Sequence, residues 1–299
     1  MTTSDHQIVP RFLLQQAEQD GVDPVRLARA AGLRSWMLDA PNARVSCLQC
    51  QRLWEHAEYA LGDPDFALRA ALRYRVGSFD LHDYLFATAP TLDIAYATVS
   101  PYIGLLTTNF GFTRTLETDH ETRFELTMID GEGRGRDLAL QFCAAALITR
   151  ARVTTDLPVA PIRVSFQHSA PRSSRMFHTA FGSAALEFDA PATSITLRRR
   201  DLELPLHTAD PALATILLNY ADRLPLPLGP TEWRDRLAEV LESALRSGAP
   251  TLLEVACLMG ISTRTLQRKL SECDTTWRRE LDRARRGSAA SARTAQRIP

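Results

Sequence analysis

Apolar residues recur at helical spacing, at positions i, i+3, i+4 and i+7, through most of the first hundred residues. Asp23 and Pro24 form a typical helix start, because aspartate caps free amide groups and proline fits the first turn. The pattern that follows them runs to Gly32. Further helices are predicted over residues 47–61 and 65–74 and in two segments of 78–106.

The pattern changes near Thr107, where β-branched and aromatic residues become frequent. Residues 107–117 and 122–130 read as an antiparallel pair of strands, and the glycine-rich segment 131–137 as a turn. Three more strands are predicted over residues 162–168, 185–189 and 194–199, with helices over 138–153, 174–182 and 211–224. The mixture predicts an α+β domain of helices and an antiparallel sheet.

Three prolines within residues 225–230, PLPLGP, predict a stiff linker. The linker divides the chain into a larger domain over residues 1–228 and a small all-α domain over 229–299. Within the second domain, residues 251–270 read TLLEVACLMGISTRTLQRKL, which predicts two short helices around a turn.

Capping signals delimit both of these helices. Thr251 and Glu254 have the spacing of a capping box, Gly260 supplies the turn, and Ser262 is a suitable cap for the second helix. Ala256 is small where the two helices would cross. The side chains expected to form a shared core are those of Val255, Met259, Ile261, Leu266 and Leu270.

The second helix has a basic outer face. At about 100° per residue, Arg264 and Arg268 lie opposite the buried leucines, as in a helix-turn-helix whose second helix enters the major groove. Arginine can bond guanine through two hydrogen bonds, and a flanking lysine suits phosphate. The predicted DNA-binding residues are Ser262, Thr263, Arg264, Thr265, Gln267, Arg268 and Lys269. An ordinary helical hairpin with a solvated arginine face is the alternative.

Residues 23–32 begin like another helix-turn-helix. Pro41 leaves too little room after Gly32 for a full second helix, so this segment is not expected to read DNA.

Charge is unevenly placed along a chain whose formal net charge is zero. Residues 231–299 hold 13 Arg and Lys against 9 Asp and Glu, whereas the first 230 residues hold 22 against 26. A basic end behind a mildly acidic body is typical of a DNA-binding appendage, and equally of a solvated basic tail. Neither a run of about 18 apolar residues nor a secretory leader pattern occurs, so we expect a cytoplasmic protein without a membrane partner.

Sequence motifs of catalysis are missing: the chain has no G-x-S-x-G, H-E-x-x-H, Walker A or paired C-x-x-C motif. We therefore expect no enzyme, cofactor or metal. Cys47 and Cys50, a single C-x-x-C on a predicted helix, are expected to be buried thiols. Asp80, His82 and Asp83 imitate a metal cluster but are predicted to be surface charges.

The sequence does not assign any residues to a small-molecule site. His82, His168 and His178 are expected to be hydrogen-bonded structural histidines. Phe110, Phe112, Phe124 and Phe142 are expected to belong to the core rather than to a pocket wall.

The segment LLEVACLMGISTRTLQRKLSE resembles the first helix-turn-helix of AraC/XylS-type transcriptional regulators, and TTWRRELDRARR resembles the linker helix that follows it. The first domain is similar to that family's arabinose-binding-like sensor domain in GVDPVRLARAAGL, GDPDFALRAALRYRVGSFDLHDYLFATAPTLDIAYATVSPY, VSFQHSAP and LELPL. The resemblance runs from about residue 20 to 286 and lies in the combination of motifs. It implies that residues 1–228 form an effector-sensing and dimerisation domain. It further implies a small-molecule effector, DNA as partner, a homodimer, and RNA polymerase as a further partner of an activator.

Family members carry a second helix-turn-helix beyond the linker helix. Here the sequence continues as RRGSAASARTAQRIP, and residues 287–299 are predicted to be a disordered tail without a second reading helix. One reading helix per chain predicts weak, salt-sensitive DNA binding. Two alternatives remain open: a truncated regulator that retains sensing or dimerisation without useful DNA binding, and a small-molecule-binding domain with an incidental helical hairpin.

Overall fold

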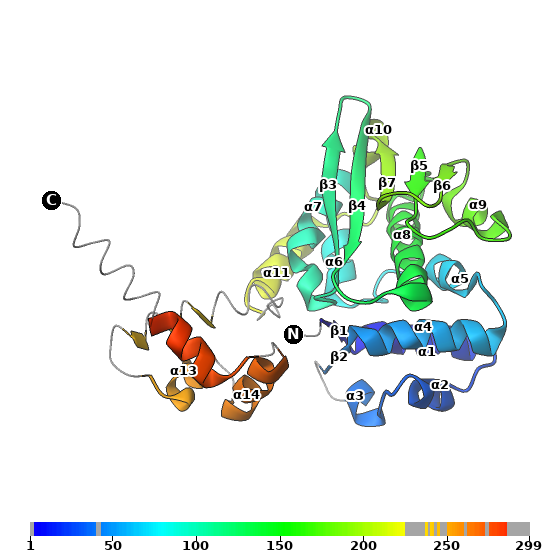
Figure 1. Ribbon diagram of the computed structural model, residues 1–299. Helices are drawn as coiled ribbons and strands as arrows, with labels where there is room; N and C mark the ends of the chain where they lie inside the picture. The colour runs from blue at the N-terminus through cyan, green and yellow to red at the C-terminus, as the bar shows by residue number, and fades with distance from the viewer. Residues whose placement is uncertain are drawn as a thin grey trace. The chain divides into compact units, whose positions relative to one another are not determined.

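A computed structural model describes residues 3–39, 43–224, 237–238, 240–241, 244–245, 250–259, 262–272 and 275–285. The chain divides into two compact units, one spanning Thr3–Pro227 and the other containing Leu228–Pro299. Figure 1 labels their elements, and each unit is considered by itself. The predicted linker 225–230, Gly260, Ile261 and the predicted tail 287–299 lie outside the described residues.

Helices dominate the first part of the Thr3–Pro227 unit, as the hydrophobic pattern predicts. The Asp23 side chain accepts hydrogen bonds from the amides of Val25 and Arg26, which fixes the start of one of them. The elements are α1 (Ile8–Gln19), α2 (Pro24–Ala30), α3 (Ser35–Asp39), α4 (Cys47–Leu61), α5 (Phe66–Leu72), α6 (Leu81–Ala87), α7 (Leu92–Val99) and the 3-10 helix η1 (Ser100–Leu105).

A five-stranded sheet forms the second layer of this unit (Figure 1). Its strands, in spatial order, are β3 (Phe110–Glu117), β4 (Glu121–Met128), β7 (Thr193–Arg198), β5 (Arg163–Ser165) and β6 (Ala185–Glu187). All five coincide with predicted strands. The sheet is mixed, however, so the prediction of an antiparallel sheet is wrong for one pair: β5 and β6 run parallel because α9 (Arg175–Phe181) lies in the connection between them.

A second, two-stranded sheet was not predicted. It pairs β1 (Ser4–His6) with β2 (Arg44–Ser46). The two strands have three residues each and only one apolar residue, Val45, between them, so they lack the alternation that identifies strands in a sequence.

The long helix α8 (Gly133–Thr155) begins inside the segment 131–137 that was predicted as a turn. The glycines there permit close packing of α8 on α4: a Cβ atom at Gly135 would lie 2.5 Å from the backbone oxygen of Gln51. The amide of Gly135 also donates to the Glu55 carboxylate at 2.9 Å. Packing between the two helices therefore overrides the local preference of glycine for turns.

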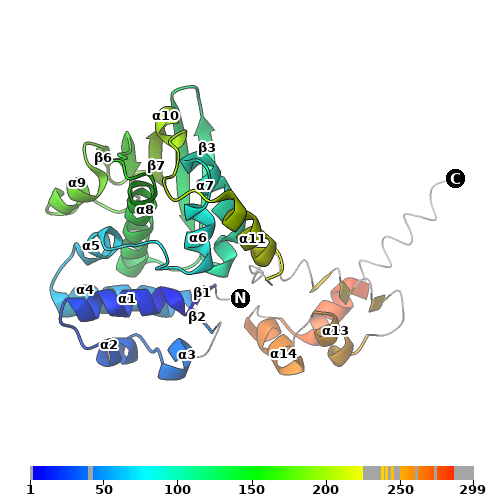
Figure 2. The ribbon, with the colours of Figure 1, turned by 180° about the vertical axis from the view of Figure 1, so that it is seen from behind.

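Helix α8 holds the two layers of the unit together. It packs against α4 and α5 on one side and contacts β4 and β7 on the other. In Figures 1 and 2 it runs between the sheet and the layer that contains α1 and α4. The remaining helices are α10 (Arg199–Leu202) and α11 (Pro211–Ala221), of which α11 contacts α6.

A buried ion pair joins α8 to α6. Arg150 donates to the Asp83 carboxylate at 2.7 Å, and the two side chains are 6% and 0% exposed. The Arg150 guanidinium also donates to the Tyr74 hydroxyl at 3.1 Å, while Asp83 accepts the amide hydrogen of Phe79 at 2.7 Å. Each charge thus has several polar partners, which a buried pair requires to offset its lost hydration.

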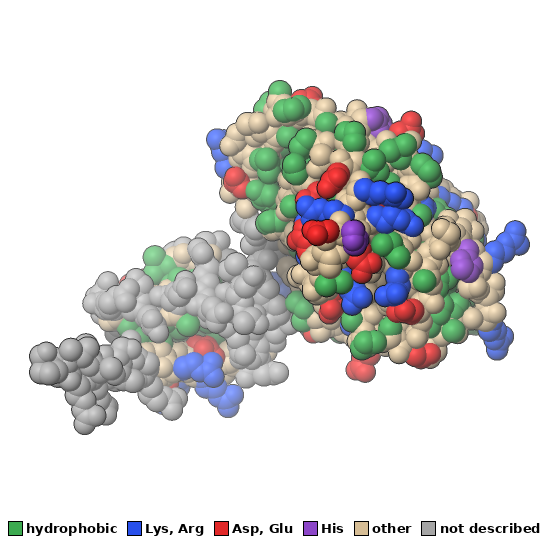
Figure 3. Space-filling model, turned by 90° about the horizontal axis from the view of Figure 1, so that it is seen from above, with side chains coloured by type: hydrophobic (Ala, Val, Ile, Leu, Met, Phe, Trp, Pro, Cys, Tyr) green, Lys and Arg blue, Asp and Glu red, His purple; other side chains and the backbone are tan. Residues whose placement is uncertain are grey.

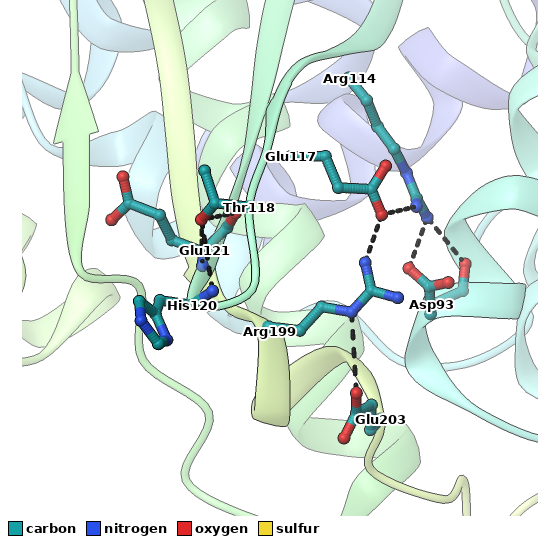
Figure 4. Close-up of polar contacts among 8 residues, drawn as sticks. All are labelled: Asp93, Arg114, Glu117, Thr118, His120, Glu121, Arg199 and Glu203. Carbon is teal, nitrogen blue, oxygen red and sulfur yellow. Dashed lines mark hydrogen bonds and ion pairs between the residues drawn. The ribbon is translucent and has the colours of Figure 1, made fainter.

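An exposed ion-pair network lies at the hairpin of β3 and β4 (Figure 4). Arg114 bonds Asp93 of α7 at 2.6 Å, and Glu117 pairs with both Arg114 and Arg199. Arg199 also lies 3.7 Å from Glu203. On the face shown in Figure 3 basic and acidic side chains are intermixed, so this face has no large field of one sign.

We expect Asp83→Asn to lower the free energy of unfolding by about 3–5 kcal/mol, because it leaves the buried charge of Arg150 without a counter-ion. Asp93→Asn, which weakens the partly exposed pair with Arg114, should cost less, about 1 kcal/mol. Urea unfolding of the full chain measures both. Equal losses in the two variants would contradict the structural role assigned to the buried pair.

Candidate functional site

A largely apolar cavity of about 110 Å³ lies inside the Thr3–Pro227 unit. Residues of α1, α4, α6, η1 and α8 line it together with residues of β3 and β4. The aromatic side chains in its wall are those of Trp54, Phe79, Phe110, Phe112 and Phe142. Concave apolar sites with a few polar groups are where proteins commonly bind small molecules.

Helix α8 supplies one side of the cavity through a single face. Its lining residues follow the i, i+3, i+4, i+7 spacing of one helix stripe. They are Ala139, Phe142, Cys143, Ala146, Leu147 and Arg150. The small side chain of Ala146, between the bulkier Phe142 and Arg150 of the neighbouring turns, leaves part of this space open.

The four predicted core phenylalanines divide between two roles. Phe112, Phe124 and Phe142 are buried, as expected. Phe110, Phe112 and Phe142 nevertheless line the cavity, so the prediction that they avoid a pocket wall is wrong. Strand alternation identifies the face that points inward, but it does not show whether the opposing helices fill the space above that face.

Most polar groups in the cavity wall have partners within the protein. Gln51 donates to the backbone oxygen of Asp130 at 3.0 Å, and the Asn109 side chain exchanges two hydrogen bonds with the backbone of Asp130. The Thr107 hydroxyl accepts the amide hydrogen of Asn109 at 3.0 Å. Arg150 is paired with Asp83.

Asp5 and the cysteines complete the polar part of the wall. Burial raises the pKa of the Asp5 carboxyl, which hydrogen bonds from Thr107 and Cys50 only partly oppose. Cys47 and Cys50 are buried free thiols on α4, as predicted. Burial raises the pKa of Cys47 to about 11 and that of Cys143 to about 12, so these thiols stay protonated and are poor nucleophiles.

His82 differs from the other polar residues of the wall. It is 2% exposed, and neither ring nitrogen has a hydrogen-bond partner among the described residues. Burial, and then the charge of Arg150, lowers the pKa of His82 well below its usual value, so the ring is neutral. An unsatisfied buried polar group costs about 1–3 kcal/mol.

The predictions for the histidines and for the 80–83 segment therefore need correction. His82 and Asp83 are buried rather than surface residues, and His82 is not hydrogen-bonded. Their positions on the inner face of the short helix α6 account for the burial. His168 fits its prediction, since its ring bonds Gln141 at 3.0 Å and the Ser169 backbone oxygen at 2.9 Å. His178 is exposed.

Among the described residues, no cluster of His, Cys, Asp or Glu has the geometry to hold a metal ion. Within the same parts of the chain, no helix is both long and apolar enough to cross a membrane.

The Leu228–Pro299 unit contains the predicted helix pair as α13 (Leu252–Leu258) and α14 (Thr263–Glu272). Thr251 and Glu254 exchange the reciprocal hydrogen bonds of a capping box, and the Ser262 hydroxyl accepts the amide hydrogen of Thr265 at 3.1 Å. The fully buried side chains of this unit's described core are those of Leu237, Leu241, Val255, Ala256, Leu266, Leu270 and Ala284. Met259 packs against them at the edge.

Helix α14 directs its leucines and arginines to opposite sides. Leu266 and Leu270 are buried, whereas Arg264 and Arg268 are exposed one helical turn apart. Of the other predicted DNA-binding residues, Ser262 and Gln267 are exposed and Thr263, Thr265 and Lys269 are partly exposed. All seven lie on the cap and first turns of one helix, which Figure 1 shows as α14.

Residues 21–206 match the family model described as the arabinose-binding domain of AraC transcription regulators, N-terminal. The chain therefore belongs to the AraC family of transcription regulators. It is 27% identical over 289 residues to the ornithine utilization regulator of Pseudomonas aeruginosa, a match that covers 96% of this chain and 84% of that protein.

A solved structure, that of the transcriptional regulator CdpR from Pseudomonas aeruginosa, matches with a TM-score of 0.49 at 16% identity. The match covers 96% of this chain and 87% of that one. The predicted family resemblance is confirmed by the family model. The protein is a transcription regulator with a ligand-binding domain, and no enzyme family is indicated.

Acidification should destabilise the protein partly through His82. The folded state holds this ring neutral, whereas the unfolded chain binds a proton below about pH 6.5. The free energy of unfolding therefore decreases by up to about 1.4 kcal/mol for each unit by which the pH is lowered. His82→Leu should flatten the dependence of the unfolding free energy between about pH 8 and pH 5. The exposed His178→Gln serves as control and should keep the wild-type slope. An unchanged slope in His82→Leu would contradict a buried neutral ring.

Proposed function

We propose that this chain is a DNA-binding transcription regulator that responds to a small-molecule effector bound in the cavity of its Thr3–Pro227 unit. The observation that carries the DNA-binding part is the geometry of α14, whose arginines face outward opposite a buried leucine face. The effector part rests on the cavity and on the ligand-binding domain of the family.

Each residue of α14 has a chemical role in this proposal. Arg264 and Arg268 bond the O6 and N7 atoms of guanine in the major groove. Gln267 and Thr263 contact adenine, a thymine methyl group or phosphate, and Lys269 binds phosphate. Ser262 and Thr265 lie at the helix start, where amide groups suit phosphate oxygens.

Association into a homodimer would place two copies of α14 on one operator, which increases the number of contacts with the DNA. An activator would in addition contact RNA polymerase. These partners, and action in the cytoplasm where the DNA lies, belong to the proposal.

Ornithine, which the name of the Pseudomonas aeruginosa relative mentions, carries several charges, and burying unpaired charges in an apolar wall is costly. We therefore do not carry that compound over to this chain. The wall instead favours an apolar effector.

Arg264→Ala/Arg268→Ala should abolish sequence-selective DNA binding. Each lost two-bond contact to a base costs about 1–3 kcal/mol, or about fivefold to hundredfold in affinity. Fluorescence anisotropy of the full chain measures this on DNA from its own upstream region and on scrambled DNA, at low and at physiological salt.

Arg26→Ala/Arg29→Ala, which removes two exposed arginines from α2, is the charge-matched control and should bind as the wild type does. Equal, salt-labile binding of the wild type to both DNAs would contradict sequence-specific reading. It would favour the alternative of a regulator without useful DNA binding.

Ala146→Phe should block effector binding by filling the cavity from α8. A library of small organic compounds, screened by thermal unfolding of the full chain, should contain compounds that raise the Tm of the wild type, because binding to the folded state stabilises it. These compounds should not raise the Tm of Ala146→Phe. Val153→Phe places the same side chain at a half-exposed position of the same helix and should respond as the wild type does. Stabilisation that persists in Ala146→Phe would place the effector elsewhere.

A further inference from the structure

One polar side chain of the cavity wall has no partner among the described residues. Both ring nitrogens of His82 lack a partner among the described residues, although the side chain is 98% buried, with 2% exposed, and lines the cavity. Three other polar side chains of the wall, those of Gln51, Asn109 and Arg150, have partners inside the protein. A ligand that reaches His82 could therefore bond its imidazole ring without competition from another group of the protein.

The cavity limits the size and shape of such a ligand. Its volume of about 110 Å³ is of the same order as the about 150 Å³ of an apolar cavity that holds benzene, and the cavity is only partly enclosed, so it admits a small ligand with a ring of that size. Five aromatic residues line it, among them Trp54 and Phe142, whose rings lie 5.1 Å apart and tilted. Aromatic rings prefer such tilted or edge-to-face neighbours, so a single aromatic ring suits this wall.

The charges around the cavity favour an uncharged ligand. Arg150 is neutralised by Asp83 at 2.7 Å, and burial raises the pKa of Asp5, which favours its uncharged form. A charged ligand would have to enter without an available counter-ion, and an apolar site opposes that strongly.

The chemistry of His82 indicates the polar group of the ligand. A neutral imidazole offers one N–H donor and one acceptor nitrogen. A hydroxyl group can accept from the first or donate to the second, and a carbonyl oxygen can accept from the first.

We propose that the cavity binds an uncharged molecule with a single benzene-sized ring and one hydroxyl or carbonyl group, and that this group hydrogen-bonds to His82. The inference rests on the proposed function only in taking the cavity as the effector site. It adds the chemical class of the effector and the residue that selects for it.

The test compares four probes of nearly equal size on the full chain: toluene, benzyl alcohol, benzoate and benzylammonium. Isothermal titration calorimetry measures their affinities at concentrations up to about 1 mM. Benzyl alcohol should bind about tenfold more tightly than toluene, because only benzyl alcohol satisfies His82. Both charged probes should bind more weakly than benzyl alcohol.

His82→Leu separates the hydrogen bond from the shape of the cavity. It should remove the preference for benzyl alcohol over toluene while toluene still binds. The exposed His178→Gln should keep the wild-type order of affinities. The ranking on the wild-type protein stands as a test even where His82→Leu fails to fold.

Benzoate or benzylammonium could instead bind more tightly than benzyl alcohol, and Ala146→Phe could abolish that binding. This result would overturn the inference about ligand chemistry but leave the cavity as the effector site. Equal affinity for toluene and benzyl alcohol would overturn the role of His82. Failure of all four probes to bind would overturn the ligand class, while the compound screen and the DNA-binding experiment separately decide the proposed function.

Discussion

The buried ion pair of Arg150 and Asp83 is the interaction on which the architecture of the Thr3–Pro227 unit depends. It joins α8, which contacts both layers, to the short helix α6. The guanidinium lies 5.1 Å and 5.3 Å from the ring centroids of Tyr74 and Phe86, so cation–π contacts add to its hydrogen bonds. Burial acts to lower the pKa of Arg150, but Tyr74 and Asp83 outweigh it and raise the pKa, which keeps the arginine charged.

The same pair shapes the cavity beside it. Arg150 is a wall residue, and its partner Asp83 immediately follows His82 on α6. The charge of Arg150 adds to burial in keeping the His82 ring neutral. The Arg150–Asp83 pair thus has two consequences for function. It holds helices that enclose the cavity, and it helps to keep the His82 ring neutral, so that the ring offers one donor and one acceptor. A buried pair of this kind adds little stability over apolar packing, but removing one partner leaves an uncompensated charge and is costly.

The sequence was sufficient for elements whose signals are local. All five strands of the larger sheet, the capped helix starts at Asp23 and Thr251, and the buried faces of α13 and α14 follow from periodicity and capping. The parallel pairing of β5 and β6 and the two short strands β1 and β2 depend on contacts between distant segments, which a local pattern does not encode. The start of α8 was missed for a similar reason, because Gly135 serves close packing on α4 rather than a turn.

The two candidate sites differ in how far the sequence predicts them. The outer face of α14 is set by helix periodicity alone, so its residues could be named in advance. The cavity is assembled from residues between Asp5 and Arg150 that are scattered over helices and strands, and an apolar lining looks like core in a sequence. The one available signal was a histidine beside an aspartate in an otherwise apolar segment, and without the fold it indicated a surface position.

The measurement that tests the central claim most directly is nitrogen-15 NMR of the His82 imidazole in the full chain, with and without benzyl alcohol. The account predicts a ring that stays neutral well below the pH at which histidine usually titrates, because burial and the charge of Arg150 lower the pKa of His82. It also predicts that the chemical shifts of one ring nitrogen move when benzyl alcohol is added. A ring that titrates near pH 6.5, as solvent-exposed histidines do, and does not respond to benzyl alcohol would contradict the cavity as a ligand site in which His82 bonds the ligand.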